Sequence, residues 1–375
     1  MKMKKSLLYL SVYDPHVPLT GAGVRGAEFV NNLAERFTLD LVYIDGSGHP
    51  PNPELSKKFA SKVKGVREKI VIPFSQKDYF IFSSKLYKSA EKLLQQNQYN
   101  VLLCDYGLSA IYGLKLSKRF KLPFVYCSHN LEYLQYWGKA KADKRRYLFI
   151  PYVYWAEKNG VKKSKILVPI SDGDAEYYTR WTRPEKMIVI PQGFDENIFN
   201  PFYEPVENDP KIVLFCGNYN IQTNMDVVRI TMEKILDKVL AKCPNTKFQF
   251  VGSNPPTDIK HPNVEFTGFV EQLPPYLKSA DVIISPIQQG WGMPTKIIEA
   301  LAVGKTTIAT PIAARSVPKD YQLLKVVETE QFPETICNAL NNGKFVSDVD
   351  FEKLKEQYSW RANIMRLADR IEQEL

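Results

Sequence analysis

Short apolar runs alternate along this chain with longer segments in which apolar residues recur at helical spacing. Runs typical of buried strands cover residues 7–13, 39–44, 101–104, 124–127, 166–170, 187–190, 212–216, 248–251, 264–266, 281–285 and 306–310. Helices are predicted at 24–37 and at 223–241, the second with Thr223 or Asn224 as its N-cap. This alternation predicts an α/β protein with parallel sheets that are covered by helices on both faces.

The length of the chain and a turn-rich segment near its middle predict two domains. A chain of 375 residues can bury two separate cores. Segment 191–201, with the sequence PQGFDENIFNP, divides the alternating pattern in two. We interpret it as a hinge between two Rossmann-like domains, about which the domains close.

A glycine-rich turn that opens a helix is the most informative motif. Segment 290–300 reads GWGMPTKIIEA; Pro294 suits a first helical turn, and Gly304 suits a left-handed helix end. The two glycines allow close approach of a ligand, and the helix start offers N–H groups to an anion. Lys296 and Glu299 share a helix face and suit a phosphate and ribose hydroxyls, respectively. A tight helix–sheet turn without a ligand has the same pattern.

The net charge of +9 raises the question of an anionic partner. Nucleic acid is not expected, because the chain lacks helix-turn-helix, zinc-finger and aromatic RNA-binding signatures. Basic residues concentrate in 138–150, read as one helical segment, and Tyr152, Tyr154 and Trp155 follow at once. This combination suits an anionic membrane surface, and equally a packed helix with a solvated lysine face. The aromatic-rich segment 79–88 suits either a core or a membrane contact.

Cysteine spacing and hydropathy indicate a cytoplasmic protein. The five cysteines are far apart and form no C-x-x-C pair or zinc spacing, which is typical of buried thiols in a reducing compartment. No apolar run is long enough to span a bilayer, and the basic start reads as the beginning of the first strand. Peripheral association with the inner face of the membrane stays an open alternative.

Segment 290–310 resembles the donor-site signature of family 4-like glycosyltransferases (glycosyl transferases group 1) with the GT-B fold. It is similar to the branch that reads G-x-G-x-x-x-K-x-x-E-A-x-A-x-G, with Trp291 where the better-known version has a further glutamate. Four other segments resemble parts of the family. Segment 191–195 resembles its hinge, and segment 215–218 resembles the start of its second domain. Segment 267–270 resembles its base-contacting segment, and segment 358–375 resembles its terminal helix. His129 lies in 129–132, HNLE, which resembles the family's H-N-x-E segment.

The resemblance implies two Rossmann-like domains that face each other across a cleft. Residues 1–192, with a helix at 358–375 that crosses back, form the acceptor domain, and residues 193–357 form the nucleotide-sugar donor domain. The implied catalytic residues are Lys296, His129 and Arg25. The implied donor-binding residues are Gly21, Gly23, Gly217, Asn218, Gly268, Phe269, Val270, Gly292, Met293, Pro294, Thr295, Lys296 and Glu299. Gly21, Gly23 and Arg25 are expected in and just after the first strand–helix turn, beside the diphosphate, whereas geometry alone also suits a tight turn with a surface arginine.

The predicted function is that of a retaining, metal-independent hexosyltransferase that moves a sugar from a nucleoside diphosphate sugar to an acceptor hydroxyl. No cofactor is expected beyond the nucleotide sugar as co-substrate. The acceptor is expected to be a glycan or a lipid-linked glycan in bacterial surface polysaccharide or glycoconjugate synthesis. A nucleotide-sugar epimerase of GT-B fold and a catalytically silent nucleotide-sugar-binding protein stay open as alternatives.

Overall fold

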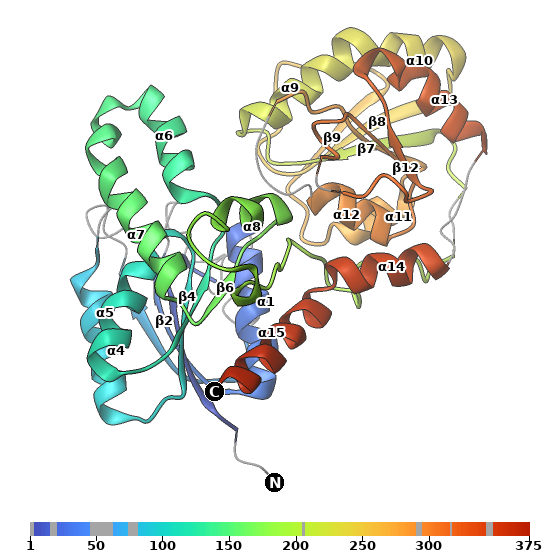
Figure 1. Cartoon of the computed structure of the whole chain (residues 1–375). Helices are drawn as coiled ribbons and strands as arrows, with labels where there is room; N and C mark the ends of the chain where they lie inside the picture. The colour runs from blue at the N-terminus through green and yellow to red at the C-terminus, as the bar shows by residue number, and fades with distance from the viewer. Residues whose placement is uncertain are drawn as a thin grey trace. The chain divides into compact units, whose positions relative to one another are not determined.

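Each half of the chain forms a six-stranded parallel sheet with its own covering helices (Figure 1). The computed structural model describes residues 4–15, 21–45, 63–73, 82–204, 207–289, 295–315, 317–342 and 348–375. The chain divides into two compact units. Unit 1 comprises Met1–Gln192 and Trp360–Leu375, and unit 2 comprises Gly193–Ser359.

The sheet of unit 1 has the strand order β3-β2-β1-β4-β5-β6. Its strands are β1 (Ser6–Ser11), β2 (Thr38–Ile44), β3 (Val66–Ile72), β4 (Val101–Asp105), β5 (Phe124–Cys127) and β6 (Ile166–Val168). Its helices are α1 (Gly21–Arg36), α4 (Ser84–Gln96), α5 (Ala110–Phe120), α6 (Glu132–Ala142), α7 (Ile150–Lys163), α8 (Asp172–Tyr178) and α15 (Trp360–Glu374), with a 3₁₀ helix, η2, at Lys144–Phe149. The inner strands are continuous apolar runs because both of their faces are covered.

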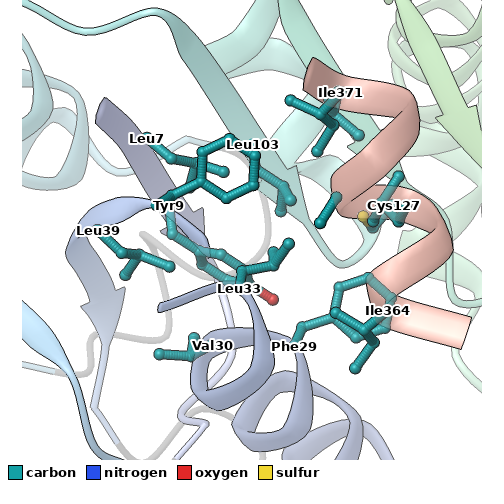
Figure 2. Packing of buried hydrophobic residues seen from close by; sticks show 14 of the residues in the cluster. Leu7, Tyr9, Phe29, Val30, Leu33, Leu39, Leu103, Cys127, Ile364 and Ile371 are labelled. Carbon is teal, nitrogen blue, oxygen red and sulfur yellow. The ribbon is translucent and has the colours of Figure 1, made fainter. Parts of the chain in front are cut away.

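The first and the last helix of the chain cover one face of this sheet together. Figure 2 shows side chains of β1, α1 and α15 meeting in one apolar cluster, which includes Leu7, Tyr9, Phe29, Leu33, Ile364 and Ile371. An ion pair of 2.9 Å between Arg36 and Glu372 closes the edge of the α1–α15 contact. The opposite face packs against α4, α5 and α7 through a second cluster. The C-terminal helix is therefore an integral part of the core of unit 1.

The sheet of unit 2 has the strand order β12-β11-β10-β7-β8-β9. Its strands are β7 (Lys211–Cys216), β8 (Thr246–Val251), β9 (Val264–Gly268), β10 (Val282–Ser285), β11 (Thr307–Ala309) and β12 (Leu324–Val326). Its helices are α9 (Gln222–Ile230), α10 (Leu236–Lys242), α11 (Pro274–Ser279), α12 (Thr295–Ala302), α13 (Phe332–Asn342) and α14 (Asp348–Tyr358), and a π-helix at Thr231–Ile235 joins α9 to α10. The two sheets confirm the predicted α/β class.

Several sequence-based predictions of elements were wrong. Segment 187–190 is not a strand: it makes one isolated bridge, Leu167 to Met187, as the chain passes the short edge strand β6. The edge strands β3 and β12 were not predicted. Helix 223–241 contains the π segment, and its N-cap is Ile221, because α9 begins at Gln222 and both Thr223 and Asn224 lie inside its first turn.

Two further segments of unit 1 differ from expectation. The basic segment 138–150 is not one helix, since α6 ends at Ala142 and η2 follows before α7. Gly21 and Gly23 lie inside the first turn of α1 rather than in the turn that precedes it. Of the aromatic-rich segment 79–88, the part from 82 onwards is described, and there Leu86 is fully buried in the core.

Candidate functional site

The strand order of unit 2 places a switch point between β7 and β10. From β7 the chain moves outward to β8 and β9, and it later returns to β10 on the other side of β7. Ligands of open parallel sheets bind beyond the carboxyl ends of the strands at such a point. The segment after β7 begins with Gly217 and Asn218, and α12 follows β10. The predicted donor-binding residues of unit 2 therefore come from loops and a helix that follow these strands.

Three glycines bring the backbone close together at this end of the sheet. Gly217 N–H donates to the Val251 carbonyl at 2.8 Å, and Gly252 N–H donates to the Gly268 carbonyl at 3.1 Å. A Cβ on Gly252 would lie 2.0 Å from the Gly217 oxygen, and φ of Gly252 is +136°. Gly268 also has a positive φ, +73°. Side chains are excluded here, so backbone groups can approach a ligand directly.

The Lys296 amine lies against this glycine cluster. Its Nζ donates to Asn224 Oδ1 at 2.7 Å and lies 4.6 Å from the centre of the Phe215 ring. A Cβ on Gly217 would come within 2.9 Å of Nζ, so the glycine leaves room for the amine. Burial lowers the pKa of Lys296, and the nearby Cys216 and Glu299 partly oppose that effect. A desolvated cation at the start of a helix suits a phosphate.

Glu299 lies one turn further along α12. Burial raises its pKa to about 7, and the charge of Lys296 only partly opposes this shift. The described residues make no hydrogen bond to its carboxylate. Such a group is a strong acceptor for hydroxyl donors once a ligand supplies them.

The other predicted donor-binding residues of unit 2 differ in how their side chains are placed. Asn218 Oδ1 accepts from Asn220 N–H and from Asn254 Nδ2, both at 3.0 Å, so its side chain is used to hold the loop. Phe269 is 52% exposed and Val270 packs against the core. Thr295 begins α12, and Gly304 ends it with φ +75°, as expected. Gly292, Met293 and Pro294 lie outside the described residues.

In unit 1, His129 lies just past the carboxyl end of β5, as expected. It is buried, and its Nε2 is 2.8 Å from Asp105 Oδ1 at the end of β4. Burial lowers the pKa of His129, and the Asp105 carboxylate opposes the shift. The Tyr106 ring meets the imidazole edge-on at 4.9 Å. Asp105 therefore orients a predominantly neutral imidazole.

Arg25 is fully buried, so the alternative that it is a surface arginine in a tight turn is wrong. Its Nη1 donates to the carbonyls of Ile190 at 2.8 Å and Pro191 at 3.2 Å, and its guanidinium lies 4.7 Å from the centre of the Phe29 ring. The Gln192 side chain donates to the Gly21 carbonyl at 2.9 Å. The first turn of α1, with Gly21 and Gly23, thus binds the chain where it leaves unit 1.

Three residues at these sites escaped the sequence analysis. Asn224 is buried and contacts Lys296, Asp105 contacts His129, and Gly252 packs against Gly217. Asp105 had a recognisable signal, since it is the charged residue at the end of the apolar run 101–104. The roles of the other two depend on contacts between segments that are far apart in the sequence. Within the described ranges, no helix is both long and apolar enough to cross a bilayer.

Comparison with known proteins gives two family matches. The model of glycosyl transferases group 1 matches residues 210–342, and the model of glycosyltransferase family 4 matches residues 19–197. An uncharacterized glycosyltransferase of Methanocaldococcus jannaschii, MJ1607, is 24% identical over 70% of this chain and 70% of its own length. Together the two models span most of both units.

Solved structures share the fold at low identity. The crystal structure of Alr3699/HepE of Anabaena in complex with UDP has a TM-score of 0.70 and 12% identity, and covers 98% of this chain and 100% of that one. The same protein has also been solved with UDP-glucose. A putative UDP-N-acetylglucosamine 2-epimerase of Listeria monocytogenes has a TM-score of 0.56 and 10% identity, with 99% and 97% coverage.

Fold alone does not separate transferase from epimerase, because a solved glycosyltransferase of Rickettsia africae and the putative epimerase each cover 99% of this chain. The family matches do separate them, since each model describes glycosyltransferases and one falls in each unit. The glycosyltransferase relative points the same way. The chain therefore belongs to the group 1 glycosyltransferases, with the two-domain GT-B fold.

Proposed function

We propose that this glycosyltransferase moves a hexose from a nucleoside diphosphate sugar to an acceptor hydroxyl, with retention of configuration and without a metal ion. The observation that carries the proposal is the placement of Lys296 and Glu299 on one face of α12, beside glycine-lined backbone at the switch point of unit 2. The Anabaena neighbour, solved with UDP and UDP-glucose, supports a nucleotide-sugar donor.

Bond breaking transfers negative charge to the departing diphosphate. Lys296 and the backbone N–H groups at the start of α12, which begins at Thr295, would supply the positive field that stabilises it. Backbone at Gly217, Gly268, Phe269 and Val270 would hold the nucleotide, and Glu299 would accept hydrogen bonds from the ribose. The retaining mechanism is expected from the family, and the anomeric configuration of the product, read by NMR, tests it.

Unit 1 would supply the groups that meet the sugar and the acceptor. His129, oriented by Asp105, would contact the donor sugar, and Gly21 and Gly23 would lie near the diphosphate. Arg25 would contribute a fixed positive charge, since it lies near Asp105 and His129 and is held by backbone carbonyls. A hydroxyl of a glycan or of a lipid-linked glycan, in surface polysaccharide or glycoconjugate synthesis, would be the nucleophile.

An aromatic–basic patch on unit 1 supports peripheral membrane association. The patch comprises exposed Leu134, Trp137, Tyr147, Leu148 and Trp155 with exposed Lys141, Lys144 and Arg145, which lie on α6, η2 and α7. Leu148 is 81% exposed. Aromatic and leucine side chains surrounded by cations suit the headgroup region of an anionic bilayer. We propose that this patch docks unit 1 on such a surface, where a lipid-linked acceptor would be presented.

A panel of UDP-, GDP- and ADP-sugars, with and without glycan acceptors, tests the proposed reaction. Acceptor-dependent release of nucleoside diphosphate is the expected result. Interconversion of free nucleotide sugars without an acceptor would instead indicate an epimerase. Nucleotide binding without any turnover would indicate a silent binding protein and would refute the proposed reaction.

A further inference from the structure

Asn224 connects the Lys296 amine to the loop that follows β7. The residue lies in the first turn of α9, and its side chain is buried. Its Oδ1 accepts from Lys296 Nζ at 2.7 Å, and its Nδ2 donates to the Asn218 carbonyl at 2.7 Å. Its backbone N–H donates to the Ile221 carbonyl at 2.9 Å. Both ends of this amide are therefore occupied.

The orientation of the amide follows from the chemistry of its neighbours. The Asn218 carbonyl can only accept a hydrogen bond, so it must face the NH₂ end of Asn224. The amide oxygen is then left for the Lys296 ammonium, which can only donate. Asn218 is itself held by Asn220 and Asn254. Asn224 thus offers an acceptor at a fixed position.

The Lys296 side chain needs a fixed hydrogen-bond partner if its amine is to stay in one position. Its four-carbon stem is flexible, and holding the ammonium in one position before a ligand arrives removes an entropic penalty from binding. The hydrogen bond to Asn224 uses one of three N–H donors, and the Phe215 ring lies 4.6 Å from the nitrogen. Among the described residues the amine has no second hydrogen-bond acceptor, so donors stay available to an anion.

We infer that Asn224 is a positioning residue that holds the Lys296 amine where it meets the diphosphate of the donor. The inference rests on the proposed function, because it takes the anion at Lys296 to be the diphosphate. A neutral amide is suited to this task. It anchors the ammonium without cancelling its charge, whereas a carboxylate at the same place would compete with the phosphate for the lysine.

Calorimetric binding of UDP and of uridine to the full-length protein tests the inference, because the difference between the two ligands isolates the diphosphate. Asn224→Ala is expected to weaken UDP binding about tenfold, as for loss of a hydrogen bond to a charged group, and to leave uridine binding nearly unchanged. In a Lys296→Met background the same substitution should have little further effect. Gln222→Ala, an exposed change in the same helical turn, is the control.

Asn224→Asp separates positioning from a merely structural role. Aspartate keeps an acceptor for Lys296 but cannot donate to the Asn218 carbonyl, so a merely structural role predicts equal losses of UDP and of uridine binding. Positioning of a cation for a phosphate predicts a loss of UDP affinity at least as large as for alanine. Equal UDP affinities in wild type and Asn224→Ala, or the same loss with and without Lys296, would overturn the inference.

A second measurement does not depend on the identity of the ligand. The rate at which an amine-specific acylating reagent modifies Lys296, read by peptide mass spectrometry, should rise severalfold in Asn224→Ala, because the hydrogen bond favours the unreactive ammonium. Unchanged labelling would overturn the inference even if UDP binds. If wild type binds none of UDP, GDP and ADP while labelling rises, the positioning of Lys296 stands and the diphosphate donor is refuted.

Discussion

Replacing Glu299 with glutamine should raise the free energy of unfolding of the protein and weaken its binding of UDP. In the folded protein burial raises the pKa of Glu299 to about 7, from an ordinary value of 4.5. The folded state therefore binds a proton more tightly than the unfolded state between those values, and stability falls as pH rises through this window. Above about pH 7, wild type holds a carboxylate that burial disfavours. Glutamine has nearly the same shape and carries no charge at any pH.

The size of the effect follows from the pKa difference. A shift from 4.5 to about 7 corresponds to roughly 3 kcal/mol that disfavours the ionised form in the folded state. The attraction between Lys296 and the Glu299 carboxylate is already contained in this pKa, so it is not subtracted a second time. We therefore expect a gain in the free energy of unfolding of about 1–3 kcal/mol at about pH 8, and little gain at about pH 5.

Urea denaturation of the full chain, followed by circular dichroism across this pH range, measures the difference. Glu233→Gln, an exposed substitution in unit 2, is the matched control. Calorimetry with UDP should show the opposite trend, with about tenfold weaker binding to Glu299→Gln at about pH 8. A stability difference that is the same at both pH values would refute the assignment of a half-buried carboxylate with a raised pKa. Unchanged UDP affinity would refute its role at the ribose.

Three further variants test the donor site and the patch. Lys296→Met keeps the stem but removes the charge, so turnover at saturating donor should fall about tenfold to a thousandfold; near-normal turnover would show that Lys296 does not stabilise the leaving group. Replacing the three exposed basic residues of the aromatic–basic patch with glutamine should reduce sedimentation with anionic vesicles, at about 1 kcal/mol per residue, and leave activity on a soluble acceptor intact. Failure of wild type to bind such vesicles would refute the membrane proposal. Gly252→Ala should lower the melting temperature and abolish UDP binding, because its Cβ would overlap the Gly217 oxygen at 2.0 Å; a normal melting temperature would show that the loop accommodates it.

The central strands could be predicted because their environment is uniform. Strands β1, β4 and β5 are covered on both faces, so nearly every position is apolar and the run is visible without knowledge of the fold. Edge strands lack that signal. β3 carries Arg67, Glu68 and Lys69 in succession and is largely exposed, and β12 is only three residues long. Their strand conformation comes from pairing with β2 and β11, which a local pattern does not encode.

The residues of the candidate site likewise fall into two groups: those that a local sequence pattern predicts and those that it does not. Lys296 and Glu299 are visible in the sequence because both lie within one turn of one helix that follows a glycine-rich segment. Asn224 reaches the same place from the first turn of α9 and Gly252 from the loop after β8, both more than forty residues away along the chain. Arg25 shows most clearly what a local sequence pattern cannot predict. Its position near the start of a helix suggests exposure, but the rings of Phe29 and Trp360 and the chain at 190–191 pack around it and bury it.

Lys296 and Glu299 do not behave as a stabilising ion pair, although they carry opposite charges on one helix face. Attraction alone would raise the pKa of the lysine and lower that of the glutamate. Both pKa values move the other way, because burial outweighs the attraction. The two groups therefore make the ligand-free protein less stable. A diphosphate would supply the negative charge that Lys296 lacks, and ribose hydroxyls would supply the donors that Glu299 lacks, so a nucleotide would offset both deficits at once. A packing role gives no reason to keep either charge, whereas a donor-binding role requires both.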